Sequence, residues 1–276
     1  MHFSRSTKAL IPAAILAALA CAPAASAAQI LPQETGFNQL ISQGSQPWNS
    51  HGGSGSAGAS TEAESTNWSG YAATGSTYTT VSTSWVQPSV NCNTTPNSYA
   101  AFWDGLDGYS SETVEQTGTM GECAGRTAEY YAWYETYPNP SYSVPYAVNP
   151  GDVITATVSV VPNSDNEGFN LTLSDASVKG GKYNWSETTT QTVKSAPALS
   201  SAEVIAEAPS NQFGQILPLA NFGSVAFSNP TVDGTALSTQ SGLSEIEMVA
   251  QQRRSVVPEA SPSAISSAGF SITWES

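Results

Sequence analysis

The sequence predicts an all-β protein, an antiparallel β-sandwich or jelly roll, and three observations support this prediction. From Thr66 to the C-terminus the chain is dominated by Thr, Ser, Val and Tyr, and Val, Tyr and Thr are enriched in strands. Strand-length segments there are separated by clusters of Pro, Gly and Asn, which are typical of turns. No segment of this region repeats apolar residues at the 3.6-residue period of an amphipathic helix.

Four segments show the strand period most clearly. Residues 153–161 alternate apolar and hydroxylated side chains up to Pro162, and residues 169–173 repeat the period of two. Residues 224–227 and 270–274 have the same pattern. Many short strands with regular turns are typical of a sandwich, and about 210 residues suit one such domain.

The N-terminal 28 residues have the features of a secretory signal peptide. Arg5 and Lys8 give a positive start, residues 9–20 are apolar, and residues 25–27 (Ala-Ser-Ala) form a small-residue cleavage site. The apolar run is too short to span a bilayer, which disfavours the alternative of a membrane anchor. We therefore expect residues 1–28 to be removed and the protein to be secreted and extracellular, with no membrane attachment afterwards.

Residues 29–64 are expected to be a flexible leader or propeptide. The tract 51–60 is rich in Gly, Ser and Ala, and nothing before it is long enough to bury a core. A plain disordered tail is the alternative. The change in composition near Thr66 places the folded domain at residues 65–276.

The chain is strongly acidic. Its formal net charge is −14, and loss of Arg5 and Lys8 with the signal peptide makes it −16. Such a surface repels nucleic acid and anionic lipid, so neither is an expected partner. Few bases also means little positive self-repulsion when carboxyl groups become protonated, which suits an enzyme that works in acid; a merely soluble surface is the alternative explanation.

Two cysteines remain after Cys21 is removed with the signal peptide. An even number in an exported chain predicts one disulfide, between Cys92 and Cys123. Closing a loop of about 30 residues would stabilise the fold by about 3 to 4 kcal/mol on the chain-entropy model. Two cysteines are too few for a metal site, and we expect no metal or other cofactor.

The folded domain contains no histidine, because His2 lies in the signal peptide and His51 in the leader. This excludes a Ser-His-Asp triad, a Cys-His pair and a His-ligated zinc site. A serine with a lysine base would need Lys179, Lys182 or Lys194, which lie in or near turn-like and polar stretches. Carboxylates are then the natural acid-base groups. The Asp-Thr-Gly and Asp-Ser-Gly turns of aspartic proteases are absent.

Two glutamate pairs have strand spacing. Glu203 and Glu207 are four residues apart, and Glu245 and Glu247 two apart, so each pair faces one side of an extended strand. From spacing alone a solvated sheet face is the expected role of either pair. Paired carboxylates on a sheet also cleave glycosides, and that alternative stays open at this point.

Five short blocks of sequence stand out together. The blocks are residues 67–72 (Asn-Trp-Ser-Gly-Tyr-Ala), 103–108 (Trp-Asp-Gly-Leu-Asp-Gly), 115–118 (Glu-Gln-Thr-Gly), 132–138 (Ala-Trp-Tyr-Glu-Thr-Tyr-Pro) and 202–207 (Ala-Glu-Val-Ile-Ala-Glu). They resemble one family, the glutamic peptidases or eqolisins. They keep the family's order, and the similarity runs from about Thr66 to the C-terminus. Any one block is weak evidence, but together, in a secreted β protein without histidine in its domain, they are a strong signal.

The resemblance implies a concanavalin-like sandwich of two curved antiparallel sheets, with substrate across the concave face. It implies that Gln116 and Glu207 are the catalytic pair, and that Glu203 is not catalytic. It further implies supporting or substrate-binding roles for Trp68, Asp107, Trp133 and Glu135. Without the resemblance, Gln116 and Glu135 would be ordinary strand residues, the tryptophans packing residues, and Asp107 a turn residue.

The expected function is that of a secreted, acid-acting endopeptidase. Glu207 would act as general base on a water molecule, and Gln116 would orient that water and stabilise the oxyanion. Protein or peptide substrates are the expected partners, and a monomer the expected form. The alternatives are a glycan-binding or glycan-cleaving jelly roll and an inactive relative that only binds peptide.

Overall fold

The computed structural model describes residues 40–41, 60–165, 167–176, 184–194, 197–252 and 255–275. The predicted signal peptide, most of the expected leader, and the two histidines lie outside these residues. In the described ranges the regular structure is almost entirely strand, with one 3-10 turn, η2 (Leu237–Thr239). No helix there is long and apolar enough to cross a membrane. The predicted all-β class is confirmed.

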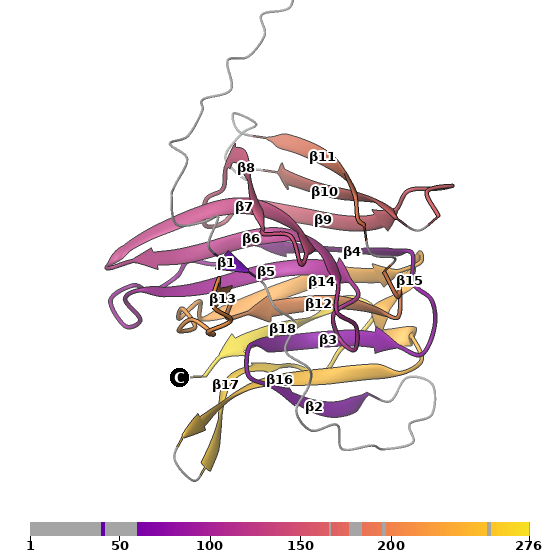
Figure 1. The fold of residues 1–276 in the computed structure, drawn as a ribbon. Helices are drawn as coiled ribbons and strands as arrows, with labels where there is room; N and C mark the ends of the chain where they lie inside the picture. The colour runs from indigo at the N-terminus through magenta and orange to yellow at the C-terminus, as the bar shows by residue number, and fades with distance from the viewer. Residues whose placement is uncertain are drawn as a thin grey trace, which may run out of the picture.

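The long strands share one hydrogen-bonded order (Figure 1). One layer runs β8 (Tyr142–Ala147), β7 (Thr127–Tyr137), β6 (Val114–Ala124), β5 (Ser98–Leu106), β12 (Ser201–Glu207), β3 (Trp68–Thr74) and β16 (Leu243–Gln252). The order continues through β17 (Ser255–Pro262), β18 (Gly269–Trp274), β14 (Ser224–Val232), β4 (Thr80–Val86), β9 (Val153–Val160), β10 (Gly168–Ala176) and β11 (Trp185–Thr192).

The two halves of this strand order pack face to face. β5 and β6 contact β9, and β6 contacts β10, although these strands share no ladder. The interior is filled by one apolar cluster, in which Trp85 and Phe227 meet edge to face with ring centroids 5.6 Å apart. β4 and β9 bury alternate residues against it, as a strand with one inward face should. The structure is thus a sandwich of antiparallel sheets, and the predicted strands correspond to β9, β10, β14 and β18.

A second apolar cluster covers the opposite face of the first layer. Trp68, Trp103 and Trp133 lie in it together with Ile205. β12 is therefore buried on both faces, since Val204 joins the interior cluster and Ile205 the second one. This explains why a strand that carries two glutamates is buried along its whole length.

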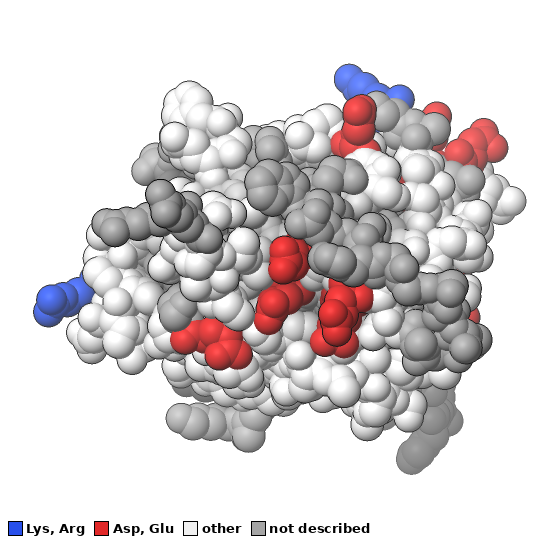
Figure 2. All heavy atoms as spheres, turned by 90° about the horizontal axis from the view of Figure 1, so that it is seen from below, with Lys and Arg blue, Asp and Glu red and all other residues white. Residues whose placement is uncertain are grey.

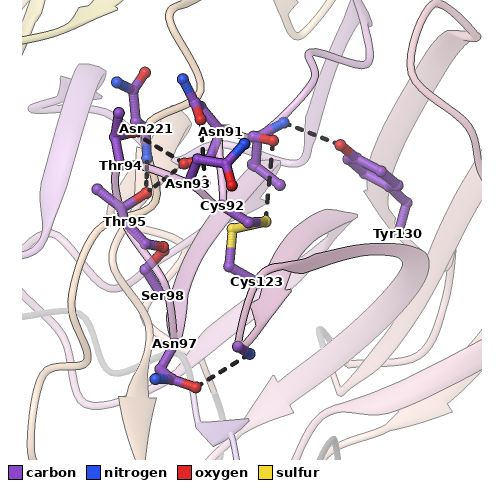
Figure 3. Close-up of a disulfide and its surroundings, with 12 residues drawn as sticks. Asn91, Cys92, Asn93, Thr94, Thr95, Asn97, Ser98, Cys123, Tyr130 and Asn221 are labelled. Atoms are coloured by element: carbon purple, nitrogen blue, oxygen red, sulfur yellow. Dashed lines mark hydrogen bonds between the residues drawn. A yellow bond between two sulfur atoms is a disulfide. The ribbon is translucent and has the colours of Figure 1, made fainter.

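The predicted disulfide is present (Figure 3). Cys92 and Cys123 are 31 residues apart in sequence and join the loop before β5 to the end of β6. Close to it, the backbone N–H of Val90 donates to the hydroxyl of Tyr130 at 3.0 Å. The bond fixes the end of β6 that lies away from Gln116.

Four short strands extend this framework. β15 (Thr235–Ala236) pairs with β14, and β2 (Thr61–Ser65) pairs in parallel with β16. β1 (Leu40–Ile41) pairs antiparallel with β13 (Ser210–Asn211). The sheet therefore takes in residues just before position 65, and one segment of the expected leader contacts the chain soon after Glu207.

Candidate active site

Strand register places Gln116 and Glu207 on the same face of the first layer. Glu203 pairs with Gly105, which pairs with Gln116, which pairs with Glu135. Cross-strand partners point to the same side, and so do residues four apart on one strand. Glu207 therefore faces the same way as Glu203, and with it Gln116 and Glu135. This is the face of the second apolar cluster.

Each carboxylate oxygen of Glu207 accepts a hydrogen bond. The indole Nε1–H of Trp103 donates to Oε2 at 2.8 Å, and the Nδ2 amide of Asn67 donates to Oε1 at 3.1 Å. An indole N–H and an amide NH2 are donors only, so they favour the ionised form of the acid. Glu207 is 0% exposed in the full-length chain, which removes competition from bulk water.

Gln116 is anchored by Glu135 on the neighbouring strand. Its Nε2 donates to Glu135 Oε2 at 2.7 Å, and both side chains are buried. A side-chain amide carries a second N–H and a carbonyl oxygen, so this bond fixes the amide plane while the group keeps both donor and acceptor character. That combination is the one required of a residue that holds water and then stabilises an oxyanion.

Gly105 allows Gln116 and Trp103 to meet above β5. A Cβ atom at Gly105 would lie 3.0 Å from Gln116 Cβ and 3.0 Å from Trp103 Cζ3, closer than side chains normally approach. The Trp103 indole thus reaches from the Glu207 carboxylate at its Nε1 to the space beside Gln116. It is the physical link between the two predicted catalytic residues.

Trp68 and Trp133, for which the family resemblance implied supporting or substrate-binding roles, also lie on this face. Trp68 is opposite Glu207 in the ladder and packs edge to face on Trp103, with centroids 5.0 Å apart at 74°. Trp133 is opposite Gly118, two residues from Gln116. Both are buried in the full-length chain. Both side chains belong to the apolar cluster on the face of Gln116 and Glu207.

Asp107 has a different position. Its carboxylate accepts from the backbone N–H groups of Leu199 at 2.7 Å and Ser200 at 2.8 Å, and from the Ser200 hydroxyl at 3.1 Å. These bonds hold the turn that leads into β12. Asp107 itself has a positive φ of 67°, which Asp tolerates better than most residues. Its support of the site therefore passes through the start of β12.

Two further buried acids lie near Asp107. Burial raises the pKa of Glu115 from 4.5 to about 9, with a further contribution from Asp107. Burial also raises the pKa of Glu203 well above its usual value; Asp107 and Glu115 add to this, whereas the Ser201 hydroxyl and the Tyr109 backbone oppose it. Neither oxygen of Glu115 has a hydrogen-bond partner in the described part of the chain. Both acids are protonated at acid pH.

The second glutamate pair lies elsewhere. Glu245 and Glu247 line a pocket of about 320 Å³ with Glu62 and Glu64, and Tyr71, a residue of the interior cluster, donates to Glu245 at 2.8 Å. The face in Figure 2 shows several acidic groups and few basic ones. Among the described residues no group of three or more His, Cys, Asp or Glu has an arrangement that could hold a metal ion.

The sequence analysis missed Asn67 and Trp103 as site residues. Both lie inside blocks that carried the resemblance, but nothing in their residue types marked them as contacts of Glu207. Their role appears only when β3, β5 and β12 are paired, because each reaches Glu207 from a different strand or strand entry.

The comparisons with known proteins agree with this geometry. The model of the Peptidase A4 family matches residues 66–274. This chain belongs to the Peptidase A4 family. Membership confirms the resemblance to the glutamic peptidases and favours a peptidase over the glycan-acting jelly roll.

Solved structures of peptidases show the same fold. A complex of scytalido-glutamic peptidase with a transition state analog inhibitor has a TM-score of 0.60 at 22% identity and covers 76% of this chain and 98% of that one. SCP-B, an eqolisin in complex with the tripeptide Ala-Ile-His, has a TM-score of 0.54 at 22% identity with the same coverage. Aspergilloglutamic peptidase from Aspergillus niger has a TM-score of 0.50 at 24% identity and covers 64% and 99%. A comparison with curated proteins gave no match.

Proposed function

We propose that this Peptidase A4 member is a secreted endopeptidase that works at acid pH, with Glu207 and Gln116 as its catalytic pair. The supporting observation is their common face, with the Trp103 indole bound to Glu207 and placed beside Gln116 over Gly105. Family membership and the likeness to peptidases solved with peptide or inhibitor support peptide substrates.

The proposed reaction is the addition of water to a peptide carbonyl. Ionised Glu207 takes a proton from a water molecule that the Gln116 amide orients, and the water oxygen bonds to the carbonyl carbon. The carbonyl oxygen gains negative charge and is stabilised by the Gln116 N–H. Glu207 then gives its proton to the amide nitrogen as the C–N bond breaks, which leaves a carboxyl group and an amine.

The decisive test compares Glu207→Gln and Gln116→Ala with the matched control Glu203→Gln. The mature domain is incubated with a denatured protein at about pH 4, and the new amino termini are counted. We expect loss of the base to lower the rate about 10² to 10⁴-fold, and loss of the amide about 10² to 10³-fold. Parental activity in Glu207→Gln would refute the proposal, and binding without cleavage by the parent would favour the inactive relative.

The leader is proposed to keep the precursor inactive. Gln116 and Glu207 are both 0% exposed in the full-length chain, and substrate must reach them. The leader strand β1 pairs with β13, which begins three residues after Glu207. We expect a protein that starts at residue 60 to cleave substrate much faster than one that starts at residue 29. Equal rates from the two proteins would show that the leader does not control access.

A further inference from the structure

Asn67 connects the entry of β3 with Glu207. Its Nδ2 donates to Glu207 Oε1 at 3.1 Å, and its side-chain Oδ1 accepts from the Ser65 hydroxyl at 3.2 Å. Its backbone carbonyl accepts from the N–H of Ala208, the residue after Glu207, at 2.9 Å. These bonds hold Asn67 between the end of β2 and the end of β12, and its side chain is buried, with 1% exposed.

Ser65 determines which way the Asn67 amide points. The Ser65 oxygen already accepts the backbone N–H groups of Asn67 at 3.3 Å and Trp68 at 3.1 Å. Its hydroxyl hydrogen is therefore the group that meets the Asn67 side chain, and this requires the amide oxygen on that side. The NH2 group must then face Glu207. The amide orientation follows from the hydrogen bonds alone.

Neutral donors matter for the charge of Glu207, because the face of the first layer that carries it has no Lys or Arg among the described residues. Arg126 lies in the turn between β6 and β7, and Lys194 follows β11 in the other layer. The titratable groups that β12, β5, β6 and β7 present on the face of Glu207 are Glu203, Tyr99, Glu122, Glu129, Tyr131, Glu135 and Tyr137. None of these side chains is a cation, so none of them offers a positive charge to the carboxylate of Glu207.

We propose that Asn67, oriented by Ser65, is a positioning residue that together with Trp103 keeps Glu207 ionised in acid. The inference rests on the proposed role of Glu207 as general base. Protonating Glu207 would remove the negative charge from the acceptor and weaken the bonds from Asn67 and Trp103. The base thus remains available at a pH at which an ordinary buried glutamate is protonated. Glu203, four residues away, is such a glutamate, since burial raises its pKa.

The experiment measures the acid limb of the pH profile of kcat/KM for the mature domain on a peptide substrate. Asn67→Ala and Trp103→Phe each remove one donor, and each should move the acid limb up by about 1 to 2 pH units. Ser65→Ala should move it in the same direction by less, because the amide loses its fixed orientation but not its NH2. At the pH plateau KM should stay near the parental value.

Asn170→Ala is the matched control, because Asn170 accepts from Thr190 on the other layer at 2.8 Å and should leave the limb unmoved. An inactive Glu207→Gln with an acid limb that stays within about 0.3 pH units in Asn67→Ala would overturn this inference alone. An active Glu207→Gln would instead overturn the proposed function. If Asn67→Ala fails to fold by circular dichroism, Ser65→Ala and Trp103→Phe decide, and unmoved limbs in both overturn the inference.

Discussion

Glu203 and Glu207 lie on one strand and one face, four residues apart, and both are 0% exposed. Their surroundings differ. Glu207 receives an N–H on each oxygen, from Asn67 and Trp103, whereas Glu203 lies near the acids Asp107 and Glu115. Equal burial thus accompanies different hydrogen-bond surroundings. Burial is the main cause of the raised pKa of Glu203. The two donors are the feature that sets the surroundings of Glu207 apart from those of Glu203.

The largest expected effect separates the two glutamates. Glu207→Gln should lower kcat/KM about 10² to 10⁴-fold, since it removes the base. Glu203→Gln should keep the rate within about threefold, because a protonated acid and an amide are similar in shape and charge. Parallel rate measurements at one acid pH check this contrast. A large loss in Glu203→Gln with little loss in Glu207→Gln would reverse the assignment.

Stability should fall as pH rises above about 4.5, because the buried acids keep their protons to a higher pH in the folded state than in the unfolded state. The pKa of Glu115 is raised from 4.5 to about 9, so its contribution is complete below about pH 4.5 and is lost as pH rises toward 9. Between pH 4.5 and 7 the loss is roughly 3 kcal/mol. Denaturant unfolding at several pH values measures it.

Glu115→Gln is the variant that tests this pH dependence. It should flatten the fall in unfolding free energy across that window, while Glu112→Gln, an exposed change nearby, should not. A parent protein whose stability is constant from pH 4.5 to 9 would contradict the prediction.

A smaller effect is expected at the anchor of Gln116. Glu135→Ala removes the acceptor of the 2.7 Å bond, so the amide can rotate away from the water and the rate should fall about 10²-fold. Glu135→Gln keeps an acceptor oxygen and should lose less. Rates of both variants with unchanged melting temperature would assign the loss to orientation, and an undiminished rate in Glu135→Ala would show that Gln116 needs no anchor.

The smallest effect concerns the turn before β12. Asp107→Asn weakens the bonds to Leu199 and Ser200 by removing the charge, so stability should decrease by about 1 kcal/mol. It also removes a charge that raises the pKa of Glu203 and Glu115, so the fall in stability with pH should become less steep. Thermal melts at pH 4 and pH 7 measure both effects. A steeper fall would contradict the described acid cluster.

Much of the fold could be predicted from the sequence, but unevenly. Residues 153–161 show the alternation of a strand with one buried face, and β9 confirms it. β12 has no such alternation, because apolar clusters cover both of its faces. The strand order could not be read locally, since β3 lies between β12 and β16, whose residues are far from it in sequence.

The site was predictable to the extent that the family resemblance covered it. Gln116 and Glu207 were named from sequence blocks, and register then placed them on one face. The role of Asn67 was out of reach, because it depends on the direction of one amide. That direction is set by a serine two residues away and a glutamate 140 residues away.

The position of Asn67 has a consequence for producing the protein. Asn67-Trp68-Ser69 matches the acceptor sequence for N-linked sugars, and the atom that would carry the sugar is the same Nδ2 that donates to Glu207. A eukaryotic secretory host attaches such sugars to chains as they emerge, before this asparagine is enclosed. Each molecule glycosylated at Asn67 would keep only one N–H on Nδ2 and carry a glycan on the face of Glu207, so bacterial expression is the suitable route to a uniform protein.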